Sequence, residues 1–233
     1  MVRVAVAGAR GKLGNTAHAA FSNDANVEYA GGFAREAEPG NAILDSFDAL
    51  LAREPDVLFD ATTMPASFEL TMEAAARGIR PVIGASGWNA EQRAELGSAL
   101  EEAGIGGLLV PNFSLGAVLM MRFAQEAACY FPNAEIVEMH RASKKDKPSG
   151  TALETAARIK RGGGDAAAIH SVRLPGLLAH QEVLFGGAGE LLTIRHDSTS
   201  YESFVRGMLL AVRAVMQLDG LVVGLDAVMS SWE

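Results

Sequence analysis

A short basic stretch in an acidic chain could carry proton chemistry. The chain has 233 residues and a formal net charge of −8, yet His140, Arg141 and Lys144 lie close together, with Lys145 and Lys147 beside them. A histidine titrates near neutral pH and can exchange a proton. Clustered cations attract an anionic small molecule. The stretch therefore predicts proton transfer on an anionic substrate such as a carboxylate, and a solvated loop without a ligand is the alternative.

The residues that follow offer a second way to bind an anion. Ser149, Gly150 and Thr151 come directly after Pro148 and open an expected helix over 150–161. Unpaired N–H groups at the start of a helix attract negative charge. Cations and a helix N-terminus together favour a carboxylate ligand.

A glycine-rich loop near the N-terminus predicts a dinucleotide site. Gly8, Gly11 and Gly14 form a G-x-x-G-x-x-G pattern after an apolar strand and before a helix. Such glycines permit a tight turn, a close approach of the backbone to a pyrophosphate, and close packing of helix on strand. A glycine-rich turn without a ligand is the alternative.

The end of the second expected strand bears on the type of dinucleotide. Ala34 occupies the position where NAD-binding proteins of this type carry an acidic residue, and Arg35 follows. An arginine without that carboxylate favours a 2′-phosphate, so the sequence predicts a preference for NADPH over NADH. The alternative is that Glu36 or Glu38 takes the acidic role and Arg35 points to solvent.

The elements that must position these residues alternate in the first half of the chain. Short apolar runs suit parallel strands that are covered on both faces. The expected strands are 2–7, 27–33, 57–60, 81–84 and 107–110, with helices near 11–21, 43–53, 66–77 and 89–103. This alternation predicts an α/β fold with a Rossmann-type, doubly wound parallel sheet.

The second half predicts a smaller α+β domain for substrate binding and oligomerisation. Its expected elements are a helix over 114–131, a strand over 134–140, a helix over 150–161, strands 169–174, 180–185 and 190–196, and a helix over 201–217. Consecutive strands indicate a mixed or antiparallel sheet. A flexible loop is expected at Gly162, Gly163 and Gly164. The expected domains are 1–112 with 208–233, which includes a last strand near 221–225, and 113–207.

Composition excludes several classes of protein. The only cysteine, Cys129, rules out an intrachain disulfide and is expected to be a small buried hydrophobe. The longest apolar runs are too short for a membrane span, and the acidic balance argues against nucleic acid. The N-terminus shows no export signal, and no histidine or cysteine spacing suits a metal. We expect a cytoplasmic protein without metal, membrane or nucleic-acid partner.

The motifs together resemble one enzyme family. Residues 135–152, EIVEMHRASKKDKPSGTA, are similar to the signature E-[IV]-x-E-x-H-H-x-x-K-x-D-x-P-S-G-T-A of the 4-hydroxy-tetrahydrodipicolinate (dihydrodipicolinate) reductase family. The segments 84–87 (GASG) and 110–114 (VPNFS) are also similar to family segments. Residues 171–186 look most like the actinobacterial branch. The resemblance covers nearly the whole chain.

The resemblance implies a reaction and roles for residues. The implied reaction is NAD(P)H-dependent reduction of 4-hydroxy-tetrahydrodipicolinate to tetrahydrodipicolinate with loss of water, in lysine and diaminopimelate biosynthesis, by a homotetramer. It implies His140 as acid/base catalyst, Lys144 as proton donor, and Arg141, Gly150 and Thr151 as contacts to the cyclic dicarboxylate. With Ala34 and Arg35, the implied dinucleotide contacts are Gly8, Ala9, Arg10, Gly11, Lys12, Leu13, Gly84, Ala85, Ser86, Val110, Pro111, Asn112 and Phe113.

Some positions depart from the family pattern and leave alternatives open. Arg141 replaces the second histidine of the signature, and Ala85 and Ser86 replace two threonines. One alternative is therefore a paralogue that reduces another cyclic imine or oxo acid. Another is a non-catalytic dinucleotide-binding protein. Structural roles are expected for His170 and His196.

Overall fold

The chain forms two compact units. The computed structural model describes residues 1–38, 40 and 42–231. The first unit combines Met1–Phe113 with the chain from Phe204 onward, and the second unit is Ser114–Ser203. The second unit is thus inserted into the sequence of the first.

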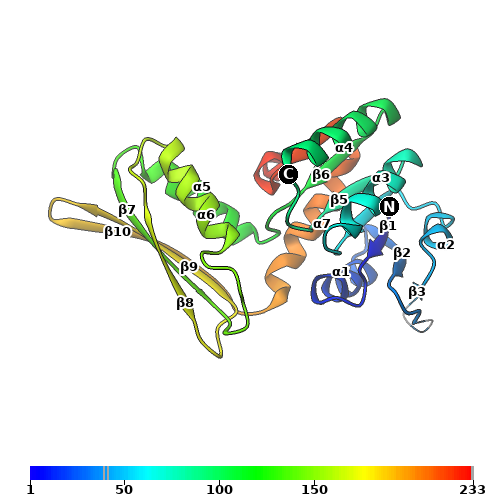
Figure 1. Ribbon diagram of the computed structural model, residues 1–233, viewed down its shortest axis with the longest axis horizontal. Helices are drawn as coiled ribbons and strands as arrows, with labels where there is room; N and C mark the ends of the chain where they lie inside the picture. Colours follow the sequence, from blue (N-terminus) through cyan, green and yellow to red (C-terminus); the bar gives the residue numbers. More distant parts are fainter. Residues whose placement is uncertain (39, 41, 232–233) are drawn as a thin grey trace. The chain divides into compact units, whose positions relative to one another are not determined.

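A seven-stranded parallel sheet forms the centre of the first unit (Figure 1). The strands are, in spatial order, β11 (Gly220–Val223), β6 (Gly106–Leu109), β5 (Arg80–Ile83), β4 (Val57–Asp60), β1 (Val2–Ala7), β2 (Val27–Phe33) and β3 (Ile43–Leu44). Each neighbouring pair runs parallel. The order reverses direction at β1, beside which β4 and β2 lie, and ligands of open α/β sheets bind at such a point.

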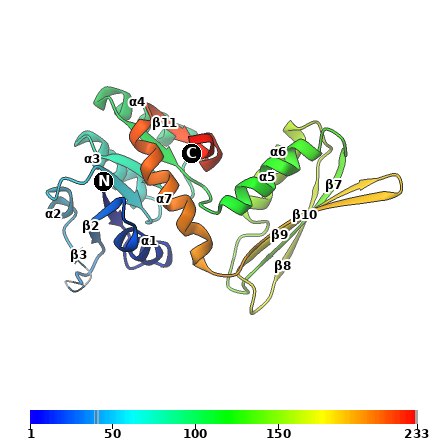
Figure 2. The ribbon, with the colours of Figure 1, turned by 180° about the vertical axis from the view of Figure 1, so that it is seen from behind.

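Helices cover both faces of this sheet (Figure 2). One face carries α1 (Lys12–Asn23) and α7 (Val205–Ala214), and the other carries α2 (Phe47–Leu51), α3 (Ala66–Ala76) and α4 (Ala90–Ala103). Successive side chains of a strand point to opposite faces, so a strand covered twice must be apolar throughout. Residues 4–7 of β1 are accordingly all fully buried.

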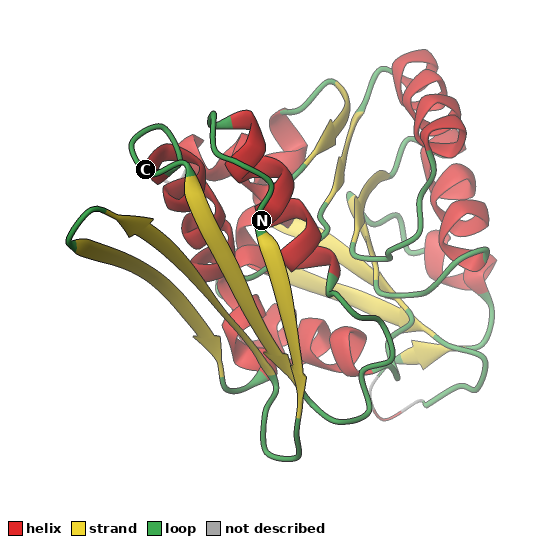
Figure 3. Ribbon diagram, turned by 60° about the vertical axis from the view of Figure 1, so that its left-hand side comes forward, coloured by secondary structure: helices red, strands yellow, loops and turns green. Residues whose placement is uncertain are grey.

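The second unit is a four-stranded mixed sheet with two helices. The strand order is β10 (Glu190–Ser198), β9 (Ala179–Gly187), β7 (Asn133–His140) and β8 (Ala168–Arg173). The helices α5 (Leu115–Ala127) and α6 (Gly150–Arg161) lie side by side on one face. The other face carries no helix from residues 114–203, all of which the structure describes (Figure 3).

The predicted fold class is confirmed, with one local correction. The helix expected over 43–53 begins only at Phe47, where Ser46 caps it, because residues 43–44 add strand β3 to the sheet edge. The sheet of the second unit is mixed, which is one of the two predicted arrangements, since β8 pairs in parallel with β7. A parallel pair needs a crossover connection, and α6 supplies it.

Two glycines of the triplet where a flexible loop is expected are closely packed, whereas a Cβ built on Gly163 would have no atom within 4 Å. A Cβ built on Gly162 would lie 2.2 Å from the carbonyl oxygen of Gln125, and one on Gly164 would lie 2.8 Å from Cγ2 of Ile159. The glycines therefore let the end of α6 approach α5. Cys129 was expected to be buried, but it is exposed, because it lies just beyond the last turn of α5.

The described residues contain neither a helix suited to a membrane nor a cluster of side chains suited to a metal ion. None of the helices there is long and apolar enough to cross a membrane. Within the same residues, no group of three or more histidine, cysteine or acidic side chains is arranged to hold a metal ion.

Candidate active site

His140 stands at the end of β7 in a buried polar arrangement. Its Nδ1 forms a hydrogen bond with Oε2 of Glu138, two residues earlier on the same face of the strand. The Glu138 carboxylate is fully buried and also accepts two hydrogen bonds from Arg173, at 2.8 and 2.7 Å. A buried carboxylate with these partners holds the imidazole in one orientation.

The environment of His140 sets its charge. Burial lowers the pKa of His140, and the nearby Lys144 and Arg173 cations add to that effect, while Glu138 opposes it. Burial alone would raise the pKa of Glu138, but hydrogen bonds from Arg173, Ser171 and His140 outweigh it and lower that pKa. The pair near neutral pH is thus a carboxylate beside a neutral imidazole, whose Nδ1 carries the proton and whose Nε2 can accept one.

The basic loop after His140 is held by several side chains. Lys144 Nζ lies 2.7 Å from Oδ2 of Asp146, and this contact lowers the pKa of Asp146. Arg141 donates to the Tyr201 hydroxyl at 3.2 Å and to Ser143 at 3.2 Å. The structure thus brings His140, Arg141 and Lys144 together where β7 ends, in a loop held by side-chain contacts.

The start of α6 follows this loop. Ser149 caps the helix, since its Oγ accepts from the N–H of Ala152 at 3.1 Å. Gly150 is exposed, and a Cβ built there would have no atom within 4 Å. The open space at Gly150, in the first turn of the helix, suits contact between backbone N–H groups and a carboxylate.

The three other histidines of the second unit have partners of their own. His170 lies 2.8 Å from Glu135, and His180 lies 2.7 Å from Asp197. His196 Nε2 lies 3.2 Å from the hydroxyl of Ser114, which caps α5. His196 therefore ties β10 to the start of α5, which is a structural role.

The glycine loop lies at the carboxyl end of β1 in the first unit. Gly8 has φ +76°, and a Cβ on it would lie 2.7 Å from the carbonyl oxygen of Ala61. A Cβ on Gly14 would lie 2.2 Å from the carbonyl oxygen of Gly8. Because the N-cap of α1 is Gly11, no side chain caps the first turn, and its N–H groups can bind phosphate oxygens. The loop fits a dinucleotide.

Two other segments expected at the dinucleotide meet beside this loop. A Cβ on Gly84 would lie 2.9 Å from both Leu13 and Phe113, which come from the glycine loop and the segment after β6. Gly84 follows β5, and its N–H donates to the carbonyl oxygen of Asp60 at 2.8 Å. The segments 84–86 and 110–113 therefore border the glycine loop.

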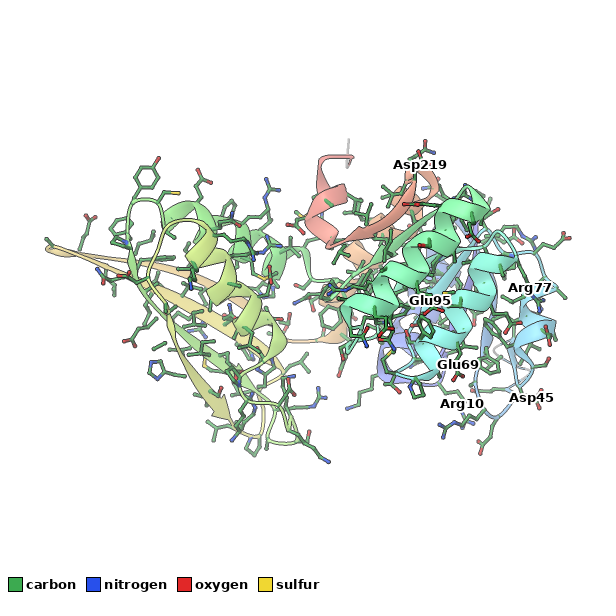
Figure 4. All side chains as sticks on the ribbon, turned by 45° about the horizontal axis from the view of Figure 1, so that its top comes forward. Arg10, Asp45, Glu69, Arg77, Glu95 and Asp219 are labelled. Atoms are coloured by element: carbon green, nitrogen blue, oxygen red, sulfur yellow. The ribbon has the colours of Figure 1, made fainter. Side chains whose placement is uncertain are left out.

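The end of β2 presents charged side chains to solvent. Ala34 donates its N–H to the carbonyl oxygen of Leu44 at 3.0 Å, and Arg35 is exposed. Arg10 lies at the outer edge of the first unit (Figure 4) and forms an ion pair with Glu36. Exposed side chains of both charges, Arg35 and Glu36, thus follow β2.

Three polar residues of the two units were not singled out as site residues from the sequence. Asp60, fully buried at the end of β4, accepts from Thr62 and from Ser67, whose hydroxyl accepts from Trp88 at 3.1 Å. This network orders the segment that touches Gly8. Glu138 and Arg173 are the other two. The two-residue spacing of Glu138 and His140 on a strand was a usable signal, whereas Arg173 is far away in sequence and gave none.

Comparisons with known proteins agree along the whole chain. Residues 2–113 match the family model described as the N-terminus of dihydrodipicolinate reductase, and residues 116–229 match the model of its C-terminus. The 4-hydroxy-tetrahydrodipicolinate reductase of Lysinibacillus sphaericus is 43% identical over 260 residues, covering 97% of this chain and 98% of the relative. That of Moorella thermoacetica is 41% identical over 258 residues, covering 97% of each.

A solved structure is similar in fold and sequence. The dihydrodipicolinate reductase from Paenisporosarcina sp. TG-14, determined with dipicolinate bound, superposes with a TM-score of 0.88 at 37% identity, covering 98% of this chain and all of that one. An amine dehydrogenase from Mycobacterium smegmatis shares the fold alone, with a TM-score of 0.72 at 13% identity over 95% of this chain and 94% of that one.

These findings confirm the resemblance read from the motifs, although they give no support for a place in the actinobacterial branch. Both halves of the chain match, and the matches extend over almost the full length of the relatives. The chain belongs to the dihydrodipicolinate reductase family of NAD(P)H-dependent oxidoreductases.

Proposed function

We propose that this protein reduces 4-hydroxy-tetrahydrodipicolinate to tetrahydrodipicolinate with loss of water, in the biosynthesis of lysine. The observation that carries the proposal is the buried Glu138–His140 pair with Lys144 beside it, at the position of the family signature. A binding protein without catalysis would have no use for this arrangement. The same reasoning makes His140 and Lys144 the proposed catalytic residues.

The proposed substrate is a cyclic dicarboxylate. The Paenisporosarcina relative binds dipicolinate, which is such a molecule. In this chain, Arg141 would hold one carboxylate, because a guanidinium can donate two parallel hydrogen bonds to it. Its contact with Tyr201 limits the orientations of the guanidinium. The N–H groups and hydroxyl of Gly150 and Thr151 would bind the other carboxylate.

The proton steps follow from the charges on the two catalytic groups. Neutral His140 can take a proton at Nε2, since Nδ1 already donates to Glu138. The Lys144 ammonium can deliver a proton to the substrate, and Asp146 holds it in place meanwhile. When bound, the dinucleotide supplies the hydride. The residues around the substrate then add or remove only protons.

We further propose that the first unit binds the dinucleotide and prefers NADPH. The proposed contacts are the glycine loop over 8–13, Ala34 and Arg35, and the segments 84–86 and 110–113. Arg10, in the glycine loop, and Arg35, just after β2, are exposed cations that suit a 2′-phosphate. Glu36 is the competing feature, because a carboxylate there favours the ribose hydroxyls of NADH. The second unit is the proposed substrate and oligomerisation domain of a cytoplasmic homotetramer.

A coupled absorbance assay tests the proposed reaction. The substrate is made freshly by its synthase, and oxidation of NADPH and NADH is followed in parallel at about 340 nm. Rapid oxidation of NADPH with slower oxidation of NADH supports both proposals. Preference for NADH refutes the proposed cofactor preference alone. Binding of NADPH without oxidation refutes the substrate, and other cyclic imines and oxo acids then distinguish a paralogue from a binding protein.

A further inference from the structure

Arg173, the last residue of β8, touches the partners of both proposed catalytic groups. Its Nη1 and Nη2 donate to the two carboxylate oxygens of Glu138, at 2.8 and 2.7 Å. Nη2 also donates to the carbonyl oxygen of Asp146 at 2.7 Å. Glu138 is the partner of His140, and the Asp146 carboxylate is the partner of Lys144. One guanidinium thus joins the histidine to the lysine loop.

The burial of the Arg173 side chain indicates that this residue does more than stabilise the fold. The Arg173 side chain is only 5% exposed and that of Glu138 is fully buried. Desolvating such a pair is costly, and well-packed apolar residues of similar size often stabilise a protein as well or better. The pairing therefore needs another explanation, and its contacts point to the two catalytic groups.

The geometry of the contacts requires an arginine. Arg173 makes four hydrogen bonds through two nitrogens, to both oxygens of Glu138 and to the carbonyl oxygens of Val172 and Asp146. A lysine offers three donors from a single atom and cannot span these acceptors in the same way. By holding Glu138 ionised and immobile, Arg173 keeps the proton of His140 on Nδ1 and leaves Nε2 as the acceptor.

We propose that Arg173 is a positioning residue of the reductase reaction, which fixes the tautomer of His140 through Glu138 and the Lys144 loop through the backbone of Asp146. The proposal rests on the proposed function for its kinetic consequences. The tautomer of His140 can nevertheless be measured by NMR without any turnover. A failure of the proposed function and a failure of this inference can therefore be told apart.

Two substitutions of Arg173 test the proposal, with Arg161→Lys as the control. Arg161 is an exposed arginine at the end of α6 that pairs with Glu154. We expect Arg173→Lys to lower kcat about 10- to 100-fold and to leave the KM for NADPH unchanged. We expect Arg173→Gln also to move the acidic limb of the pH profile to higher pH, because it removes a cation that keeps protons off His140.

NMR of the imidazole nitrogens gives the direct readout. In the wild type we expect His140 to carry its proton on Nδ1, and in Arg173→Lys we expect a mixture of both tautomers. The His140→Asn variant assigns the signal. A folded Arg173→Lys protein with wild-type kcat and the wild-type tautomer would overturn the proposal.

A double variant tests the proposal if the single variants do not fold. If both single variants unfold, Glu138→Gln/Arg173→Gln removes both buried charges and keeps the hydrogen-bonding amides. We expect this double variant to bind NADPH normally, to have a lower kcat than the wild type, and to show a mixture of both His140 tautomers. Wild-type turnover in the double variant contradicts the inference. If the wild type itself is inactive on the proposed substrate, the tautomer measurement still decides the role of Arg173.

Discussion

At the scale of single residues, the ammonium group of Lys144 is the proposed proton donor. Its ammonium is held by Asp146, and its side chain is only about a quarter exposed, at 24%. We expect Lys144→Ala to lower kcat about 10²–10⁴-fold, while NADPH still binds to the first unit. Stopped-flow reduction and NADPH fluorescence titration measure the two effects. The neighbouring Lys145→Ala is the control, and an unchanged kcat in Lys144→Ala would refute the assignment.

His196 makes stability depend on pH. Burial lowers the pKa of His196, Asp197 opposes this, and His180 adds to it. The folded state thus binds a proton less readily than the unfolded state, so stability falls as the pH drops below about 6.5. We expect His196→Gln, which can still accept from Ser114, to weaken the fall in Tm between pH 7 and pH 5.

Thermal unfolding at several pH values measures this effect. His170→Gln, at a half-exposed histidine paired with Glu135, controls for the loss of an imidazole. Acid sensitivity in His196→Gln equal to that of the wild type would show that the burial of His196 does not matter. His140, whose pKa burial also lowers, accounts for part of the remaining slope.

At the scale of elements, the junction of β1 and α1 depends on the absence of a side chain. A Cβ on Gly14 would lie 2.2 Å from the carbonyl oxygen of Gly8. We expect Gly14→Ala to push the loop away from the helix, to cost about 1–3 kcal/mol of stability, and to weaken binding of NADPH. Calorimetric titration and chemical denaturation measure both quantities.

A second helical glycine supplies the matched control. Gly97 lies inside α4, and a Cβ there would be 3.9 Å from its nearest neighbour, Cβ of Leu221. We expect Gly97→Ala to stabilise the protein by up to about 1 kcal/mol without changing the Kd of NADPH. Equal losses in both variants would mean that the close approach at Gly14 has no special role.

The sequence patterns predicted individual strands and helices better than they predicted which distant strands pair with each other. The strand, glycine loop and helix at the N-terminus are predictable because each depends on neighbouring residues. The pairing of β8 with β7 is not, because it joins residues separated by the whole of α6. Arg173 reaches Glu138 only through that pairing, across 35 positions of sequence. The basic loop was predicted, whereas the residue that holds it was not.

At the scale of the whole molecule, the second unit is inserted where two segments of the first unit meet. A Cβ on Gly207 would lie 1.9 Å from the carbonyl oxygen of Phe113, so the chain leaves and re-enters the first unit at nearly one place. We expect a chain in which a short Gly/Ser linker replaces residues 114–203 to fold and to bind NADPH with a similar Kd, without turnover. Circular dichroism and titration check this. An unfolded product would show that the first unit depends on the second.

The insertion has a consequence during protein synthesis. Strand β11 pairs with β6 at the edge of the first sheet, yet the ribosome makes residues 220–223 only after the entire second unit. Domains fold largely as units while the chain emerges. The second unit, as one continuous stretch, can fold as soon as it leaves the exit tunnel. The first unit must keep an unfinished sheet edge until residues 220–223 have been made, so it completes its sheet only after the inserted second unit has been synthesised.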